Sequence, residues 1–129
     1  MHVHAAVITL LTVLLLSIAM SLVSRARGRY KVPAPSVTGD PGFERTFRAH
    51  QNTLEQAVMF LPTLWVASLF GNEAWASWAG YAWVVARAWY LQAYVSQGGR
   101  RGAPFTLAML AWVALWLIAL VGVWPALFG

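Results

Sequence analysis

Four long apolar stretches, separated by short polar segments, dominate the pattern of hydrophobic positions along the chain. The first stretch, residues 5–23, carries no charged residue, and about 20 apolar residues suffice to cross a bilayer core as a helix. Cations follow this stretch, whereas a cleaved signal peptide has its positive charge in front of the apolar run. We therefore expect an uncleaved first span with its N-terminus outside.

Prolines and glycines punctuate the rest of the chain. Their cluster predicts a loop over 30–42, and a second helix is predicted over 43–70. A helix of about 28 residues would reach about 42 Å, which exceeds a hydrocarbon core of about 30 Å. Because its first half is polar, this helix should protrude from the membrane where it begins. Third and fourth helices are predicted over 74–96 and 105–124, on either side of a basic loop over 97–103.

The composition supports this pattern. The chain has 129 residues, of which 60% are hydrophobic and 10% charged, against about 45–50% and about 25% in soluble domains. A soluble enzyme, a disordered regulator and a disulfide-stapled secreted module are therefore excluded. The fold class is all-α integral membrane, a four-helix transmembrane bundle with residues 1–129 as one domain. There is no cysteine, so no thiolate metal site or protein thiol nucleophile exists, and we expect no bound metal.

The net charge is +5, and the placement of the cations decides the topology. Eight of the nine cations fall in two stretches: Arg25, Arg27, Arg29, Lys31, Arg45, Arg48, Arg100 and Arg101. In a four-span path both stretches lie on one side, which the positive-inside rule makes cytoplasmic. We expect a multi-pass protein of a bacterial inner membrane with both termini outside. No basic run is interleaved with aromatic residues, so we expect no nucleic-acid partner.

Ionisable residues inside a membrane helix indicate function by default. The second helix carries a cation, an amide and a carboxylate on one face, at Arg48, Asn52 and Glu55. The third helix carries Tyr90 and Tyr94 on one face, at the same end of the bundle.

Arg101 belongs to the basic loop that begins where the third helix ends. Together with Arg101, these five residues can converge on one cytoplasmic pocket. Such a set suits a small zwitterionic ligand with several carboxylates. A structural alternative is an Arg48–Glu55 ion pair, with Asn52 bonded to another helix.

This set of residues resembles the signature of the MAPEG family, the membrane-associated proteins in eicosanoid and glutathione metabolism. The matching residues are Phe43-Glu44-Arg45, Arg48-Ala49-His50, Asn52, Glu55, Phe60-Leu61-Pro62, Ala86-Arg87, Tyr90, Gln92, Tyr94, Arg101 and Pro104. The resemblance extends from about Ala26 to the end of the fourth helix. It is specific because its charged residues lie inside membrane spans.

The resemblance implies a homotrimer of four-helix protomers, with glutathione as co-substrate bound between neighbouring subunits. The residues that it implies for glutathione binding within one subunit are Arg48, Asn52, Glu55, Tyr90 and Tyr94. Arg27 and His50 would reach the site from the neighbour, and Arg101 would face the sulfur. Gln56 and Gly28 depart from the family members that synthesise leukotrienes, which argues against that activity.

The implied chemistry is activation of a thiol. A thiol with a pKa near 8.5 is mostly protonated at neutral pH, and an adjacent cation lowers that pKa and favours the nucleophilic thiolate. Arg101 would supply this cation and cannot act as a base, because a guanidinium stays protonated. The expected activity is that of a glutathione transferase or peroxidase acting on lipophilic electrophiles or lipid hydroperoxides, with membrane lipids as surroundings.

Two other functions fit the same pattern. A lipid-binding scaffold of the same fold would keep the bundle without the thiol chemistry. A small transporter subunit would more often place polar residues at the midplane, whereas here they gather at one interface. Arg100, next to Arg101, is the alternative partner for the thiolate.

Overall fold

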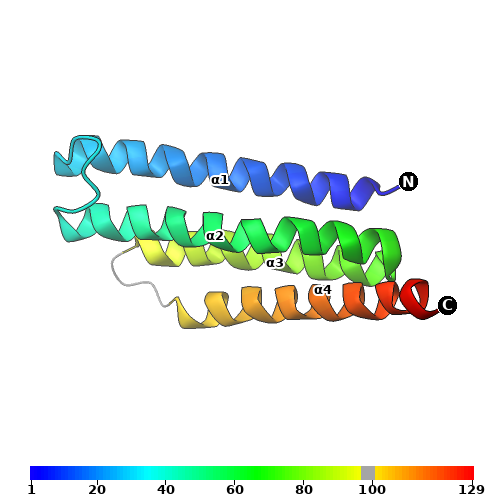
Figure 1. Cartoon of the computed structure of the whole chain (residues 1–129). Helices are drawn as coiled ribbons and strands as arrows, with labels where there is room; N and C mark the ends of the chain where they lie inside the picture. The colour runs from blue at the N-terminus through cyan, green and yellow to red at the C-terminus, as the bar shows by residue number, and fades with distance from the viewer. Residues whose placement is uncertain (97–100) are drawn as a thin grey trace.

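Four antiparallel helices make up the computed structural model, which describes residues 1–96 and 101–129 (Figure 1). The helices are α1, Val3–Tyr30; α2, Pro41–Phe70; α3, Glu73–Val95; and α4, Gly102–Phe128. Both termini lie at one end of the bundle, and the connection between α1 and α2 lies at the other (Figure 1). Within the described residues, α1 and α4 each pack on α2 and α3 but not on one another.

The first loop is shorter than predicted, because helix extends into it from both sides. α1 continues past the apolar stretch through Arg25, Arg27 and Arg29 to Tyr30, where cations suit the negative end of the helix dipole. At the start of α2, the Asp40 carboxylate accepts a hydrogen bond from the Gly42 N–H at 2.8 Å. A proline in the first helical turn lacks only an N–H that would have no helical partner there. The Asp-Pro pair is therefore a helix start and not part of the loop.

Small residues line the faces along which the helices meet. The buried positions of α1 recur every third or fourth residue and include Ala5, Ile8, Thr12 and Ala19. The buried positions of α4 are Pro104, Ala108, Ala111, Leu115 and Ala119. Small side chains let membrane helices approach closely and gain packing contacts. The opposite faces expose large apolar side chains, as lipid contact requires.

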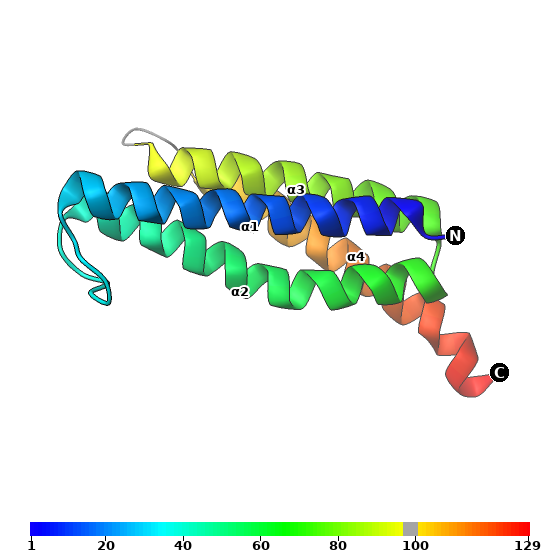
Figure 2. The ribbon, with the colours of Figure 1, turned by 90° about the horizontal axis from the view of Figure 1, so that it is seen from above.

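Three helices, α1, α2 and α4, are long and apolar enough to cross a membrane on their own. α3 lies alongside them for its whole length (Figures 1 and 2), and its hydropathy is lowered by Arg87 and its tyrosines. The prediction of an all-α, four-helix membrane bundle is confirmed. The last turns of α4 extend beyond the other helices (Figure 2).

Candidate functional site

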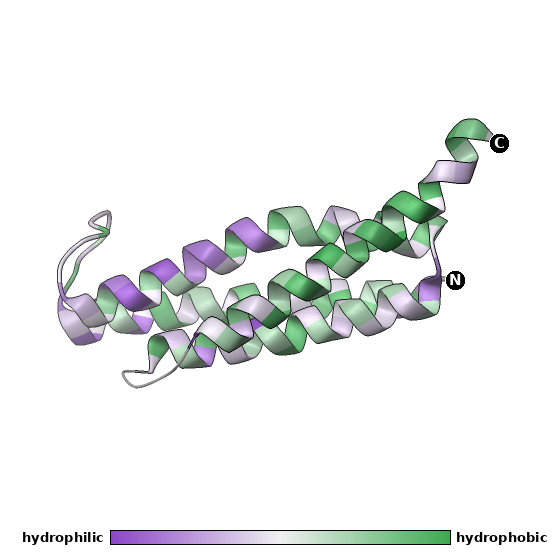
Figure 3. Cartoon of the chain, turned by 90° about the horizontal axis from the view of Figure 1, so that it is seen from below, coloured by the Kyte–Doolittle hydropathy of each residue, from purple (hydrophilic) through white to green (hydrophobic). Residues whose placement is uncertain are grey.

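The strongly hydrophilic residues of α2 are confined to the half that begins at the α1–α2 connection, while its other half is mostly hydrophobic (Figure 3). The C-terminal end of α3 and the N-terminal end of α4 lie at this same end of the bundle (Figure 1). We call this end, with the start of α2 and the end of α3, the basic end. The predicted site residues of α2, α3 and α4 therefore lie toward this end.

A buried arginine links α2 and α3 just inside the basic end. Arg87 is fully buried, and its Nη2 donates to Asn52 Oδ1 at 3.1 Å and to Thr53 Oγ1 at 2.8 Å. Its guanidinium carbon lies 4.0 Å from the centroid of the Tyr90 ring. Arg87 therefore fixes the Asn52 amide and the Tyr90 ring relative to each other. The alternative in which Asn52 bonds to another helix is what the structure contains.

An aromatic pair continues from this arginine toward the end of α3. The rings of Tyr90 and Tyr94 lie 5.3 Å apart, and Phe105 of α4 lies 6.2 Å from Tyr90. The Arg101 guanidinium carbon lies 4.5 Å from the centroid of the Tyr94 ring. A cation over an aromatic face is attracted to it, so Tyr94 orients a guanidinium that is otherwise exposed to solvent.

Arg101 lies at the N-cap of α4. The prediction had placed it within a loop over 97–103. The unpaired N–H groups at the start of α4 give the helix end a positive potential. A cation at this position is disfavoured by the dipole and adds to its field. An anion placed beside Arg101 would therefore be stabilised by both. Arg100, the predicted alternative, lies outside the described residues.

A cavity of about 240 Å³ opens between the start of α2 and the end of α3. Its lining residues are Pro41, Glu44, Arg45, Arg48 and Tyr94. Within the described residues, the Arg45 Nε is buried and has no hydrogen-bond partner. The Glu44 carboxylate accepts from the Gly39 N–H at 3.2 Å. Two guanidinium groups, those of Arg45 and Arg48, line this cavity, so it favours a ligand with acceptor oxygens.

The structure brings the predicted residues together in part. Arg48 and Tyr94 line one cavity, and Tyr94 contacts both Tyr90 and Arg101. Asn52 is joined to this group through Arg87. Glu55 is exposed, and in the described part of the chain it makes no ion pair with Arg48. The alternative of an Arg48–Glu55 ion pair is therefore wrong for the single chain.

The two residues expected to reach a neighbouring subunit lie outside this cavity. His50 is half-buried on α2. Arg27 donates through Nη1 to the carbonyls of Val32 at 3.3 Å and Ser36 at 2.7 Å, and its guanidinium lies 4.9 Å from the Phe43 ring centroid. Within one chain Arg27 therefore organises its own loop.

Sequence reasoning missed two members of the site. Arg45 matches the family signature but was given no role, although it shares a helical face with Pro41, Glu44 and Arg48 at spacings of three and four. That spacing was visible in the sequence. Thr53, the second acceptor for Arg87, carried no comparable signal, because a threonine in a membrane helix often bonds its own backbone.

Comparison with known proteins assigns the chain to a family. The model of the MAPEG family matches residues 5–121.

The chain belongs to the MAPEG family.

Among its relatives, microsomal glutathione S-transferase 2 of Bos taurus is 37% identical over 101 residues, 78% of this chain and 69% of the relative. Leukotriene C4 synthase of Bos taurus is 39% identical over 114 residues, 88% of this chain and 76% of the relative. An uncharacterised protein of Synechocystis is 35% identical over 118 residues, 92% of this chain and 86% of the relative. Two of these three relatives carry an activity in their names, a glutathione S-transferase and a leukotriene C4 synthase.

Proposed function

We propose that this MAPEG protein is a membrane-embedded glutathione transferase that lowers the thiol pKa of bound glutathione with Arg101. One observation carries the proposal: the Arg101 guanidinium lies over the ring of Tyr94, which shares an arginine-rich cavity with Arg48. The names of the two activity-bearing relatives support glutathione as the thiol.

Each residue has a chemical role in this proposal. Arg45 and Arg48 bind glutathione carboxylates, for which a guanidinium is well suited. Asn52 and Tyr90, held by Arg87, orient the peptide, and Tyr94 holds the cysteinyl end beside Arg101. Glu55, which has no ion pair in the described residues, binds the ammonium group.

The reaction then proceeds from the thiolate. The thiol proton leaves to solvent, since no residue of the proposed site is placed as a dedicated base. The sulfur then attacks an electrophilic carbon and forms a carbon–sulfur bond. The bond from that carbon to a leaving group breaks, or its π bond opens, and the displaced electron pair stays on the leaving group or on the neighbouring atom, which solvent can protonate. The apolar surfaces of the bundle allow such electrophiles to arrive from the bilayer. With a lipid hydroperoxide, the same thiolate would cleave the O–O bond, and a second glutathione would complete the disulfide. The products are then an alcohol, water and glutathione disulfide.

We further propose that the active form is a homotrimer with its sites on the cytoplasmic side. The cavity between α2 and α3 opens to the surface, and Arg27 keeps N–H groups beyond the single Nη1 that it uses in its own loop. These groups and His50 would complete the site of a neighbour. Cross-linking and native mass spectrometry should find three copies, and a fully active monomer would contradict this part of the proposal.

Glutathione binding tests the ligand assignment. The substitution Glu55→Gln should weaken glutathione binding about tenfold, because it removes the charge that pairs with the ammonium group. Isothermal calorimetry on the purified protein measures this, and circular dichroism checks the fold. Thr63→Val, further along α2 and outside the cavity, is the control. An unchanged dissociation constant for Glu55→Gln would remove this residue from the site, and no glutathione binding by the parent protein would favour a lipid-binding scaffold.

A further inference from the structure

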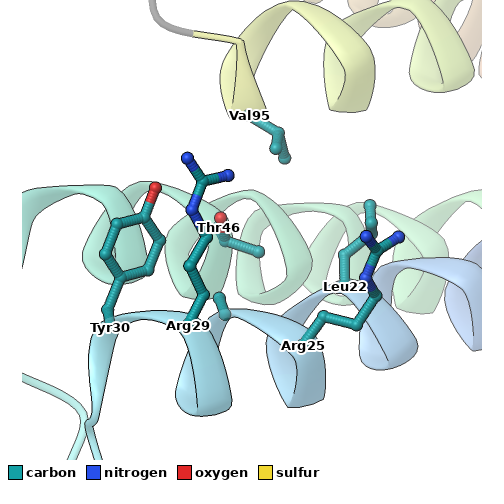
Figure 4. Close-up of a pocket in the computed structure, with 7 residues that line it drawn as sticks. Leu22, Arg25, Arg29, Tyr30, Thr46 and Val95 are labelled. Carbon is teal, nitrogen blue, oxygen red and sulfur yellow. The ribbon is translucent and has the colours of Figure 1, made fainter.

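A second basic cavity, of about 260 Å³, lies between α1, α2 and α3 on the other side of α2 from the proposed thiol site. α1 contributes Arg25, Arg29 and Tyr30, and α2 contributes Thr46. By the helical period of α2, Thr46 points away from the face that carries Glu44 and Arg48. Figure 4 shows the side chains of Arg25, Arg29 and Tyr30 rising from one side of α1 toward the end of α3.

The charge in this cavity is uncompensated. Arg25 and Arg29 are one helical turn apart, so their positive charges repel each other. The chain has four carboxylates, and none lines the cavity. Within the described residues, neither arginine makes an ion pair. Thr46 donates its hydroxyl proton to the Gly42 carbonyl at 3.1 Å, so the donors that face an incoming anion are the two guanidinium groups and the Tyr30 hydroxyl.

Arg27, between the two arginines in sequence, has a different role. Its Nη1 donates to the Val32 and Ser36 carbonyls, so it belongs to the loop and points away from the cavity. The cavity is therefore built by residues on successive turns of one face of α1 and does not overlap the residues proposed for glutathione.

An apolar stripe leads from the membrane directly to the two arginines. Leu14, Ile18 and Leu22 precede Arg25 and Arg29 at spacings of three and four, which places all five on one face of α1. Leu14 is 56% exposed and Ile18 is 47% exposed. Leu22 forms the wall of the cavity on this side.

A free inorganic anion has no apolar part that could contact this stripe. A phospholipid would use both parts, because its acyl chains lie along the apolar face and its phosphate lies where the hydrocarbon ends.

We propose that this cavity binds the headgroup phosphate of an anionic phospholipid, with its acyl chains lying along the Leu14–Leu22 face of α1. Arg25 and Arg29 hold the phosphate, and the Tyr30 hydroxyl donates a third hydrogen bond. A lipid with net negative charge is favoured over a zwitterionic one, because two cations face the ligand and no carboxylate is present to hold an ammonium group.

The test is lipid binding by the purified full-length protein in detergent, followed by native mass spectrometry with added phosphatidylglycerol. The double variant Arg25→Gln/Arg29→Gln should bind phosphatidylglycerol about 25-fold more weakly, at about fivefold for each cation that contacts the phosphate. Lys31→Gln is the matched control, because it removes a cation from the same end of α1 but outside the cavity. It should leave binding unchanged. The variant Arg25→Lys/Arg29→Lys keeps the charge and should retain most of the affinity.

Three results would overturn the proposal. One is equal phosphatidylglycerol affinity in the parent, the glutamine double variant and the Lys31→Gln control. Another is equal retention of phosphatidylcholine and phosphatidylglycerol by the parent. The third is thermal stabilisation of the parent by inorganic phosphate as large as that by phosphatidylglycerol, which would assign the cavity to a free anion. If the glutamine double variant does not fold, the single variant Arg29→Gln should show about fivefold weaker binding, and equal affinity there would also overturn the proposal.

Discussion

The half of the α2–α3 pair nearer the termini, the apolar end, differs from the basic end in what its side chains contact. In the half of α2 and α3 nearer the termini, the Phe60 and Trp83 rings are stacked at 3.8 Å and 7°. Gly122 of α4 lies so close to α2 that a Cβ there would collide with the Phe70 carbonyl. At the basic end, Arg45 and Arg48 line a cavity whose one lining carboxylate, Glu44, is already bonded to a backbone N–H. Arg101 lies beside this cavity, over the ring of Tyr94.

This contrast separates stability from ligand binding. Tight contact between apolar rings and backbones leaves no room for a ligand and contributes to the stability of the bundle. Cations without an ion-pair partner do not stabilise the protein in this way when no ligand is bound. Their interaction becomes favourable when an anion neutralises them. Substitutions at the two ends should therefore affect different measurements.

The largest expected effect is at the apolar end. Trp83 is fully buried and stacked on Phe60, so Trp83→Ala should lower the free energy of unfolding by about 3–5 kcal/mol. Trp78→Ala is the control, because Trp78 is 77% exposed and lies on a different face of the same helix. Unfolding in mixed micelles, followed by circular dichroism, measures both. Equal losses for the two tryptophans would show that burial in α3 does not determine the stability.

A smaller effect on stability is expected where the two ends meet. Arg87→Met should cost about 1–3 kcal/mol, because it leaves the Asn52 and Thr53 oxygens without their donor. Unlike Trp83→Ala, it should also weaken glutathione binding, because Asn52 loses its orientation. Calorimetry and unfolding on the same sample separate the two effects. A lower free energy of unfolding with unchanged glutathione affinity would give Arg87 a structural role alone.

The helices could be predicted from the sequence because long uncharged runs alternate with proline, glycine and charge. Their ends could not be predicted equally well. Charged residues after an apolar run, such as Arg25 and Arg29, mark the end of the hydrocarbon core but not the end of the helix. The buried face of α1 was also hidden, because Leu14 and Ala19 are equally apolar in sequence, although Leu14 is exposed and Ala19 is buried.

The candidate site was predictable as a face but not as a set of contacts. The spacing of Arg48, Asn52 and Glu55 fixes their common side of α2. It does not say which side chain bonds across the helices, and a structural Arg48–Glu55 pair was as plausible as the pairing found. The bond from Arg87 to Asn52 depends on the rotation of α3 against α2, which local spacing does not determine. Only packing between the helices fixes that rotation.

The pKa of bound glutathione tests the central proposal most directly. Glutathione is bound to the purified protein, and the ultraviolet absorbance of its thiolate is followed against pH, with the protein alone as reference. The parent should titrate at least about one pKa unit below the usual value near 8.5, which corresponds to about 1.4 kcal/mol of thiolate stabilisation. Below that lowered pKa the thiolate, and with it the rate of conjugation, should be lost.

Arg101→Ala should return the thiol pKa toward 8.5 while glutathione still binds. Arg101→Lys should give an intermediate value, because the charge remains but the planar guanidinium is lost. Arg25→Gln removes a cation on the other side of α2 and should leave the thiol pKa as in the parent. A parent thiol that titrates near 8.5, or an Arg101→Ala variant that titrates like the parent, would contradict the assignment of Arg101 as the residue that stabilises the thiolate.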